Sequence, residues 1–213
     1  MAFPTVPGQT NSSSAVSGTS HTLSLPSSVA SGEMILIQAR WLSATVPTPP
    51  SGWSQLYQIV GGTVNSIGLW KIASGGETSV SITFDATVSS VRSVSHRIAG
   101  HGGSIEAATN VQLSTANHDP PNLAPSWGLA DNLWLTIGAC GNSNYSAVPT
   151  NYGNSIYDPN TAIADALIIC ARRTLTASSE NPGTFTNTST NGLTATIAIK
   201  PTSPSRSFGY III

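Results

Sequence analysis

Short apolar or alternating segments, each bounded by turn residues, run through the whole chain. Nineteen Gly and fourteen Pro are spread along the 213 residues, and only 8% of the residues are charged, so charged helix formers are scarce. Short periodic segments between clusters of Gly, Pro, Asn and Ser are typical of β-strands. The sequence therefore predicts an all-β protein.

Twelve segments have the strand pattern. They are residues 21–25, 33–42, 55–60, 66–73, 79–84, 91–99, 104–107, 111–113, 132–140, 164–172, 184–186 and 193–200. Turn-rich stretches lie between them, as strand connections require. We expect a single β-sandwich domain at 21–200, with an N-terminal arm at 1–20 and a C-terminal arm at 201–213.

The second half of the chain resembles the first, displaced by roughly 100 residues, as in an internal repeat. The paired segments, in chain order, are Leu25-Pro26 with Leu123-Ala124-Pro125, Pro50-Ser51-Gly52-Trp53 with Pro149-Thr150-Asn151-Tyr152, 68–73 with 166–171, and Thr83-Phe84 with Thr184-Phe185. The preserved order of these landmarks indicates two duplicated halves, with pseudo-repeats at about 21–100 and 121–200.

Each half supplies about four strands whose apolar faces need a partner. Two halves packed face to face give about eight main strands, the number in a jelly-roll-like antiparallel β-sandwich. The alternative is two separate sandwiches of about 100 residues each. We expect one domain, because residues 100–131 carry strand-like pieces where a linker would otherwise lie.

One pattern in the first half resembles a known group of proteins. Leu25-Pro26-x-x-Val29-x-x-Gly32-Glu33 leads into an apolar strand, and Pro50-x-Gly52-Trp53, Trp70-Lys71-Ile72-Ala73 and Gly76-Glu77 follow. Over residues 19–100 this pattern is similar to β-sandwich virion proteins of tailed bacteriophages, which include capsid decoration (cement) proteins and tail-fibre proteins. The C-terminal half departs from it, with Tyr152 in the place of Trp53 and Cys170 in that of Ile72. The shared motifs set turns and fill a core, so the resemblance carries over no catalytic residue.

The charge balance excludes several classes of partner. Eight Lys plus Arg against nine Asp plus Glu give a net charge of −1, which leaves no basic surface for nucleic acid or an anionic membrane. Cys140 and Cys170 lack zinc-site spacing and are interpreted as core residues. Residues 1–8 lack the features of a secretory signal. We expect no cofactor, and synthesis in a host cytoplasm.

Two groups of residues are candidates for chemistry. His96, His101 and Glu106 flank a glycine-rich turn, and two His with one carboxylate can hold a non-haem iron. A solvated strand and loop is the alternative, and the His-x-His pair of cupin jelly rolls is missing. His118 and Asp119 could orient an imidazole for base catalysis, but a turn fixed by the following prolines is the favoured interpretation. We therefore predict no catalytic and no metal-binding residue.

Loop residues supply further candidates for binding. Asp158 and Asp165 could bind calcium only if the fold brings further oxygens to them. Tyr145, Tyr152 and Tyr157 lie among Asn, Ser, Gly and Asp, and we expect them to form an exposed aromatic loop that contacts a partner or a glycan. We also expect the apolar C-terminus to dock on the protein itself or on a partner. Its contact residues are Phe208, Tyr210, Ile211, Ile212 and Ile213.

These observations favour a non-enzymatic virion structural protein. The leading hypothesis is a capsid decoration protein, bound outside the head as a homo-oligomer, a trimer, with the major capsid protein or other virion proteins as partners. A neutral, Ser/Thr-rich surface suits this role, since it packs against neighbours with little charge desolvation. The alternatives are a tail-fibre or receptor-binding module that recognises a host glycan, and a metal-dependent or carbohydrate-active jelly-roll enzyme.

Overall fold

The computed structural model describes residues 2–60, 62–113, 116–141, 145–158, 167–188 and 191–203. These residues form fifteen β-strands and no helix, so the all-β prediction is confirmed. The first eight strands are β1 (Thr5–Ser14), β2 (Gly18–Ser24), β3 (Met34–Trp41), β4 (Pro47–Thr48), β5 (Ser54–Ile59), β6 (Asn65–Ile72), β7 (Ser79–Val88) and β8 (Val91–Ala99). The others are β9 (His101–Leu113), β10 (Ala130–Cys140), β11 (Tyr145–Ala147), β12 (Gly153–Tyr157), β13 (Ile168–Ala177), β14 (Thr186–Asn187) and β15 (Asn191–Pro201).

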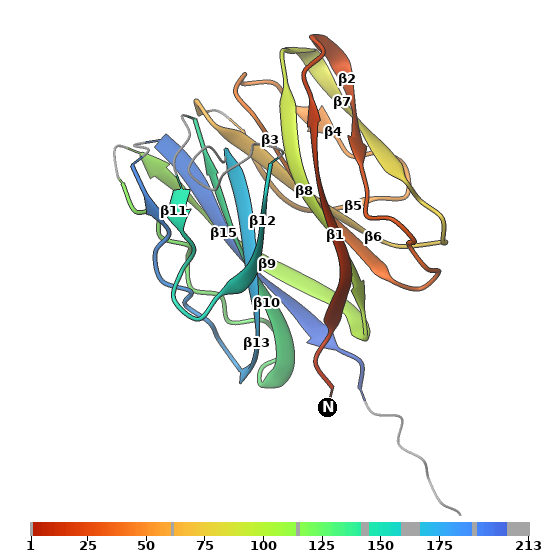
Figure 1. Ribbon diagram of the computed structural model, residues 1–213, viewed down its shortest axis with the longest axis vertical. Coiled ribbons are helices and arrows are strands. Elements are labelled where there is room, and N and C mark those ends of the chain that lie inside the picture. The colour runs from red at the N-terminus through yellow and green to blue at the C-terminus, as the bar shows by residue number, and fades with distance from the viewer. Residues whose placement is uncertain are drawn as a thin grey trace, which may run out of the picture.

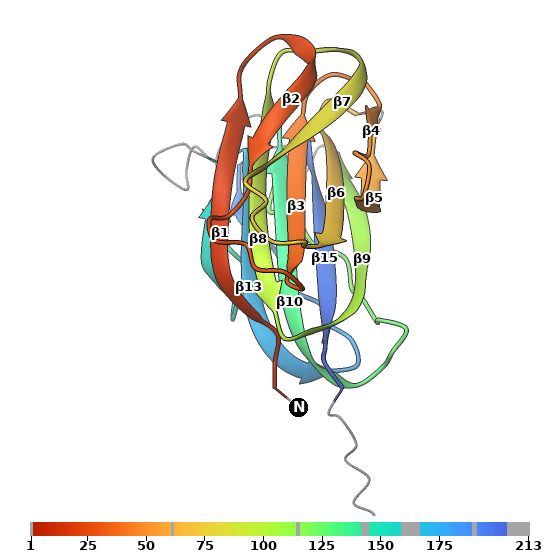
Figure 2. The same cartoon turned by 90° about the vertical axis from the view of Figure 1, so that its right-hand side faces the viewer.

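Ten of the strands form two five-stranded antiparallel sheets that lie face to face (Figure 2). The strand order of the first sheet is β1-β8-β3-β6-β5, and that of the second is β9-β15-β10-β13-β12. Each strand of the first sheet thus has a counterpart at the same place in the second. The repeated sequence segments lie on counterpart strands, β3 with β10 and β6 with β13.

The space between the two large sheets holds an apolar core to which both halves of the chain contribute. Met34 and Leu36 of β3 belong to the same buried cluster as Leu135 and Ile137 of β10. Neither large sheet could bury this face alone, and burial of apolar area is the dominant favourable contribution to folding. The two halves are therefore joined through a common β-sandwich core.

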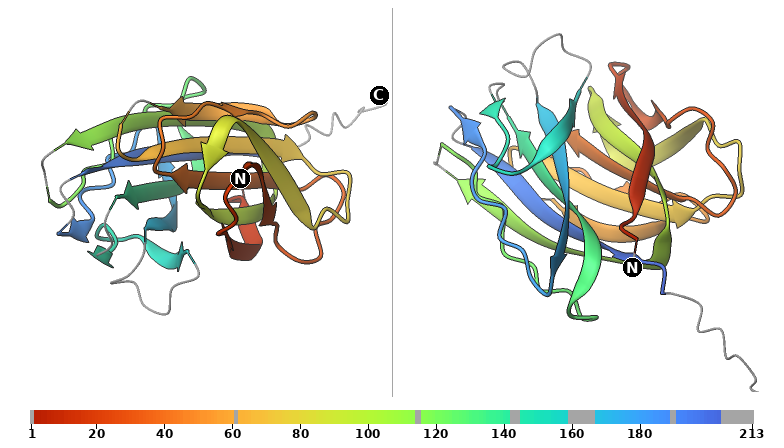
Figure 3. Two further views of the ribbon diagram at one scale, coloured as in Figure 1. Left: turned by 90° about the horizontal axis from the view of Figure 1, so that it is seen from above. Right: turned by 60° about the horizontal axis from the view of Figure 1, so that its bottom comes forward.

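Two smaller sheets cover the outer faces. Strands β2, β7 and β4 form one, on the right in Figure 1, and β11 with β14 forms the other, on the left. A second apolar cluster fills the space between β2-β7-β4 and the first large sheet. Smaller clusters lie on the outer face of the second large sheet. The views in Figure 3 show the same succession of layers from other directions.

The position of a strand among these layers explains its sequence pattern. All eight residues of β3 are buried, because a central strand with both faces covered reads as a continuous apolar run. In β7, which lies in an outer sheet, buried and exposed residues alternate from Ser79 to Phe84, as one-sided cover requires. A continuous apolar pattern therefore indicates a strand that is covered on both faces, and an alternating pattern indicates a strand that is covered on one face.

Polar contacts also join the two halves across the central core. Arg40 is 1% exposed, and its Nε and Nη2 donate to the carbonyl oxygen of Cys140 at 3.0 and 2.7 Å. Burial lowers the pKa of this guanidinium from its ordinary value. Further contacts are Arg92 Nη1 to Asp158 Oδ2 at 3.1 Å, Asn11 Nδ2 to Tyr157 O at 2.7 Å, and Arg172 Nη1 to Gln9 Oε1. Buried charges need such partners, so these contacts fix the orientation of the sheets.

The N-terminal segment differs from its expected form. Residues 5–14, expected within an arm, form β1, an edge strand paired antiparallel with β8. Its side chains are mostly half-buried or exposed, and the strand contributes few apolar residues. Backbone pairing with β8 satisfies its polar groups, which the apolar pattern in the sequence could not reveal. With β1 and β12 included, the two large sheets hold ten strands where about eight were expected.

A turn that precedes the fifth strand of each large sheet is repeated in hydrogen-bond detail. The N–H of Trp53 donates to the carbonyl of Pro50 at 3.0 Å, and that of Tyr152 donates to the carbonyl of Pro149 at 3.1 Å. The third residue of each turn has a positive φ, 79° at Gly52 and 69° at Asn151. Gly and Asn are the residues that adopt this region most readily.

Candidate functional site

The structure does not support an exposed loop built from the three tyrosines. Tyr145 is fully buried, Tyr152 is 7% exposed, and Tyr157 is half-buried. The expectation of an exposed aromatic surface is therefore wrong for Tyr145 and Tyr152. The apolar C-terminal residues Phe208, Tyr210, Ile211, Ile212 and Ile213 lie outside the described residues.

Tyr145 is buried because the neighbouring strand makes room for it. An added Cβ on Gly138 of β10 would lie 2.7 Å from the Tyr145 Oη atom, so only glycine permits this approach. The ring packs edge-on against Phe185, with centroids 5.2 Å apart, and its hydroxyl lies 3.1 Å from Nδ1 of His118. Burial raises the pKa of Tyr145 well above its ordinary value. Tyr145 is therefore a core residue of the outer layer.

Tyr152 is buried beneath an ion pair. The guanidinium carbon of Arg173 lies 5.6 Å from the centre of the Tyr152 ring, and Arg173 Nη1 lies 3.3 Å from Glu180 Oε1. The Tyr152 hydroxyl donates to the same carboxylate at 3.2 Å. Burial and then Glu180 raise the pKa of this tyrosine above its ordinary range. An aromatic ring, a cation and a carboxylate thus form one unit, in which each polar group has a partner.

The first half contains the counterpart of this unit. Lys71 Nζ lies 6.0 Å from the centre of the Trp53 ring and 3.0 Å from Glu77 Oε1. The N–H groups of Ser74 and Gly75 also donate to Glu77, at 2.7 and 2.9 Å. Burial acts to raise the pKa of Glu77, but the hydrogen bonds from Ser74 and Lys71 outweigh it and lower the pKa to about 2. Each half therefore has a cation–π contact combined with an ion pair, and the two cations lie on the counterpart strands β6 and β13.

The candidate metal residues are not brought together. His96 is 1% exposed and lies between the sheets, and its Nδ1 has no hydrogen-bond partner within the described ranges. His101 Nε2 lies 3.0 Å from the carbonyl oxygen of Gly32. Glu106 accepts from the N–H and the hydroxyl of Ser126. Within the described part of the chain, no group of three or more His, Cys, Asp and Glu could hold a metal ion.

The other candidates for chemistry have structural partners. His118 is fully buried, and its backbone N–H donates to Asn187 Oδ1 at 2.8 Å. The carbonyl of Asp119 accepts from Thr194 Oγ1 at 3.1 Å, so this segment is held against β15, but residues 118–122 are extended and irregular and form no turn. Asp158 is fully buried, where it pairs with Arg92 and accepts from a backbone N–H. Its proposed companion for calcium, Asp165, lies outside the described residues.

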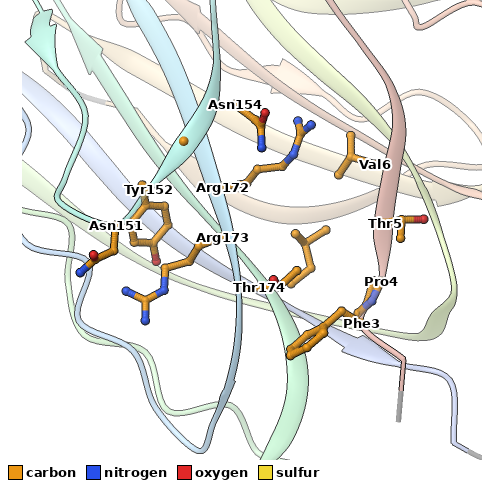
Figure 4. Close-up of a pocket in the computed structure, with 12 residues that line it drawn as sticks. Phe3, Pro4, Thr5, Val6, Asn151, Tyr152, Asn154, Arg172, Arg173 and Thr174 are labelled. Carbon is orange, nitrogen blue, oxygen red and sulfur yellow. The ribbon is translucent and has the colours of Figure 1, made fainter.

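A groove of about 680 Å³ lies between β1 of the first large sheet and β12 and β13 of the second. Residues from four separate stretches of the chain line it (Figure 4). They are Phe3, Pro4, Thr5, Val6, Leu133, Asn151, Tyr152, Gly153, Asn154, Arg172, Arg173 and Thr174. None of these twelve residues is acidic, while two of the eight basic residues of the chain are among them.

The two arginines of the groove have different partners. Arg173 pairs with Glu180, whereas the hydrogen-bond partner of Arg172 is the neutral side-chain oxygen of Gln9. Burial lowers the pKa of Arg172 from its ordinary value, although it remains a cation at neutral pH. Arg172 in turn, after burial, helps to lower the pKa of His96 to about 3, so this histidine is neutral. The groove therefore carries a positive charge that no acidic side chain balances within the described residues.

The sequence contained a signal for this groove. Arg172 and Arg173 are the only two adjacent basic residues in the chain. Adjacent side chains in a strand point to opposite faces of the sheet. One of the two arginines is therefore expected on the face toward the central core, and the other on the outer face. Only the approach of β1 to β12 showed that both border one groove.

The described residues form an all-β sandwich with a cationic groove at its edge. Comparisons of the chain with models of known protein families, with curated proteins and with solved structures found no match. No helix in the described ranges is long and apolar enough to cross a membrane.

Proposed function

We propose that the protein is a structural component of a tailed-phage virion, most specifically a capsid decoration (cement) protein that binds outside the head as a trimer. Its partner would be the major capsid protein. We also propose that the sandwich is of the jelly-roll type. Support comes from the resemblance of residues 19–100 to such proteins, from the distribution of charge, and from the long edge strand of one sheet.

The observation that carries the proposal is the neutralised surface. Four of the eight basic residues lie in ion pairs with carboxylates of the same chain, namely Lys71, Arg92, Arg97 and Arg173. A further one, Arg40, is buried on backbone carbonyls. A surface with few unpaired charges loses little solvation free energy on contact, and interface cores are depleted in charge. A low net charge also favours association over dispersal in solution.

Strand β9 supplies an edge suited to such contacts. It is thirteen residues long and lies at the end of its sheet, where β15 is its only neighbouring strand among the described residues. Natural edge strands are commonly protected by shortness, Pro or charge, but residues 107–113 contain neither Pro nor charge. Val111 within this stretch is 47% exposed. A strand or apolar surface of a neighbouring subunit would satisfy this edge.

Quantitative mass spectrometry of purified particles tests the proposal. We expect a copy number comparable with that of the major capsid protein, and heads that lack the protein should break at lower temperature. Val111→Lys should weaken binding to such heads, whereas Val16→Lys, at another exposed valine, should not. A few copies per particle, confined to the tail, would contradict the decoration role.

The groove favours a second candidate function. A receptor-binding module of a tail fibre would need a polar recess of the size of a small ligand, about 300–1,000 Å³. The groove has that size, and residues 151–154 of its lining belong to the stretch expected to touch a glycan. Loss of adsorption to the host in particles without the protein, with unchanged head stability, would favour this candidate over decoration.

A further inference from the structure

We propose that the groove between β1 and β12–β13 binds a carboxylated saccharide of one or two rings, and that Arg172 holds its carboxylate. The inference rests on the second candidate function, glycan binding, and names the class of sugar. Its three supports are the unbalanced charge, the polar lining and the aromatic ring of Phe3 at the groove. Each comes from a different set of residues.

The charge identifies an anionic ligand. Arg172 lies on β13, is half-buried, and has an amide oxygen as its hydrogen-bond partner. A guanidinium offers five donors in a planar fork that matches a carboxylate, and the bond to Gln9 uses Nη1 only. Figure 4 shows the Arg172 side chain reaching from β13 toward β1, with Asn154 beside it. The remaining donors can therefore bind a carboxylate at this end of the groove.

The neutral lining identifies a polar ligand larger than a simple ion. Asn151 and Asn154 are exposed, and both have positive φ values, 69° and 47°. The hydroxyls of Thr5 and Thr174, both exposed, lie on the same groove. Amides and hydroxyls can donate to and accept from sugar hydroxyls. An inorganic anion would use few of these groups, whereas a saccharide could use most of them.

One aromatic ring completes the set. Phe3, which is half-buried, lines the groove, whereas the Tyr152 ring is 7% exposed and lies beneath Arg173. Figure 4 shows Arg173 directed toward Asn151 and Tyr152, on the other side of the groove from Arg172 and Asn154. The Arg173 charge is matched by Glu180, so this side is electrically balanced. We therefore place the carboxylate at Arg172, with the sugar ring extending toward Phe3.

Titration of the full chain by isothermal calorimetry and by NMR tests the inference. The ligands are a diuronate, the matching neutral disaccharide, acetate and inorganic phosphate. We expect the diuronate to bind at least about tenfold more tightly than each of the others. The neutral disaccharide lacks the charge-assisted bidentate contact, and acetate and phosphate lack the hydroxyls that would bind the amides and hydroxyls of the groove. The amide signals of Asn151 and Asn154 should shift on binding.

Three variants and a control separate the role of charge from a structural role. Arg172→Gln should weaken diuronate binding about tenfold or more, while Arg172→Lys should restore part of it. Gln9→Ala removes the bond that links Arg172 to β1 but keeps the cation, so it should retain binding. Lys200→Gln, a basic residue outside the groove lining, is the control and should leave binding unchanged.

Each other result would overturn the inference in a recognisable way. Preference for the neutral disaccharide would overturn the acidic ligand while retaining glycan binding as a function. Equal binding of acetate or phosphate would show an anion site without sugar recognition. Loss of binding in Gln9→Ala to the same extent as in Arg172→Gln would show that Arg172 acts through the position of β1. Absence of binding by all four ligands would overturn both the inference and the glycan-binding candidate, while the decoration role would still depend on copy number.

Discussion

The two halves of the molecule share a frame but differ in how they cover it. Both build a five-stranded sheet with the same strand order. The N-terminal half covers its sheet with a regular three-stranded sheet over one continuous apolar cluster. The C-terminal half uses two very short strands and irregular segments over two smaller clusters. The central core therefore depends on both large sheets, whereas each cover buries the outer face of its own sheet only.

In the described part of the C-terminal half, side-chain hydrogen bonds hold the irregular cover on the sheet in place of regular strand pairing. Thr194 and Thr196 of β15 donate to the carbonyls of Asp119 and Pro121, at 3.1 and 2.6 Å. These bonds attach the irregular segment to the outer face of the sheet. An irregular cover leaves the chain free to vary in its loops, where binding residues are commonly found. The cationic groove accordingly lies at the edge of the C-terminal sheet.

The largest expected effect tests whether the halves unfold together. Trp41 and Trp134 are both fully buried, one beneath each cover. Replacement of either by Ala should lower the free energy of unfolding by about 3–5 kcal/mol, because a large cavity forms. Since the central core is shared, calorimetry should show one transition, which both variants shift to lower temperature.

The control is Leu129→Ala, at a residue that is 69% exposed, which should change stability little. Two separate transitions, each moved by only one of the tryptophan variants, would contradict the shared core. The halves would then be independent sandwiches.

The second prediction concerns the acid sensitivity of the central core. Burial, and secondarily Arg172, lowers the pKa of His96 from 6.5 to about 3. The unfolded chain therefore takes up this proton before the folded protein does, so stability is lost as pH falls from about 6.5 toward 3. The loss should reach about 1.4 kcal/mol per pH unit. Urea unfolding between pH 7 and pH 5, above the range of most carboxylates, measures it.

His96→Gln should flatten this pH dependence, and His101→Gln, at the partly exposed histidine, should leave it unchanged. An unchanged slope in His96→Gln would show that the acid sensitivity arises outside the central core, for example in one of the covers.

The smallest effect distinguishes the two cation–π units. Arg173→Met leaves the carboxylate of Glu180, 7% exposed, without its cation, and should cost about 1–3 kcal/mol. Lys71→Met should cost less than about 1 kcal/mol, because Glu77 keeps two backbone donors and its side chain is 17% exposed. Denaturant midpoints of the two variants compare them directly. Equal losses would mean that the units are interchangeable despite their different burial.

Most apolar strands of the fold were predictable, because central strands read as apolar runs and outer strands alternate. The strand β1 was not, since its residues are mostly polar and its partner β8 lies about eighty positions along the chain. The burial of Tyr145 and Tyr152 was also misjudged. Their neighbours in sequence are polar, and contacts with residues distant in sequence, such as Gly138 for Tyr145 and Glu180 for Tyr152, remove them from solvent.

The sequence by itself determined the strand class, the repeated turns and the repeated order of landmarks, because these depend on local side-chain periodicity and on backbone preferences of Pro, Gly and Asn. The tertiary structure alone decided which edges meet. The groove exists because β1, from the start of the chain, lies beside β12 and β13, from its second half. Contacts between distant segments depend on how the apolar faces of whole sheets fit together, and no local pattern encodes that fit.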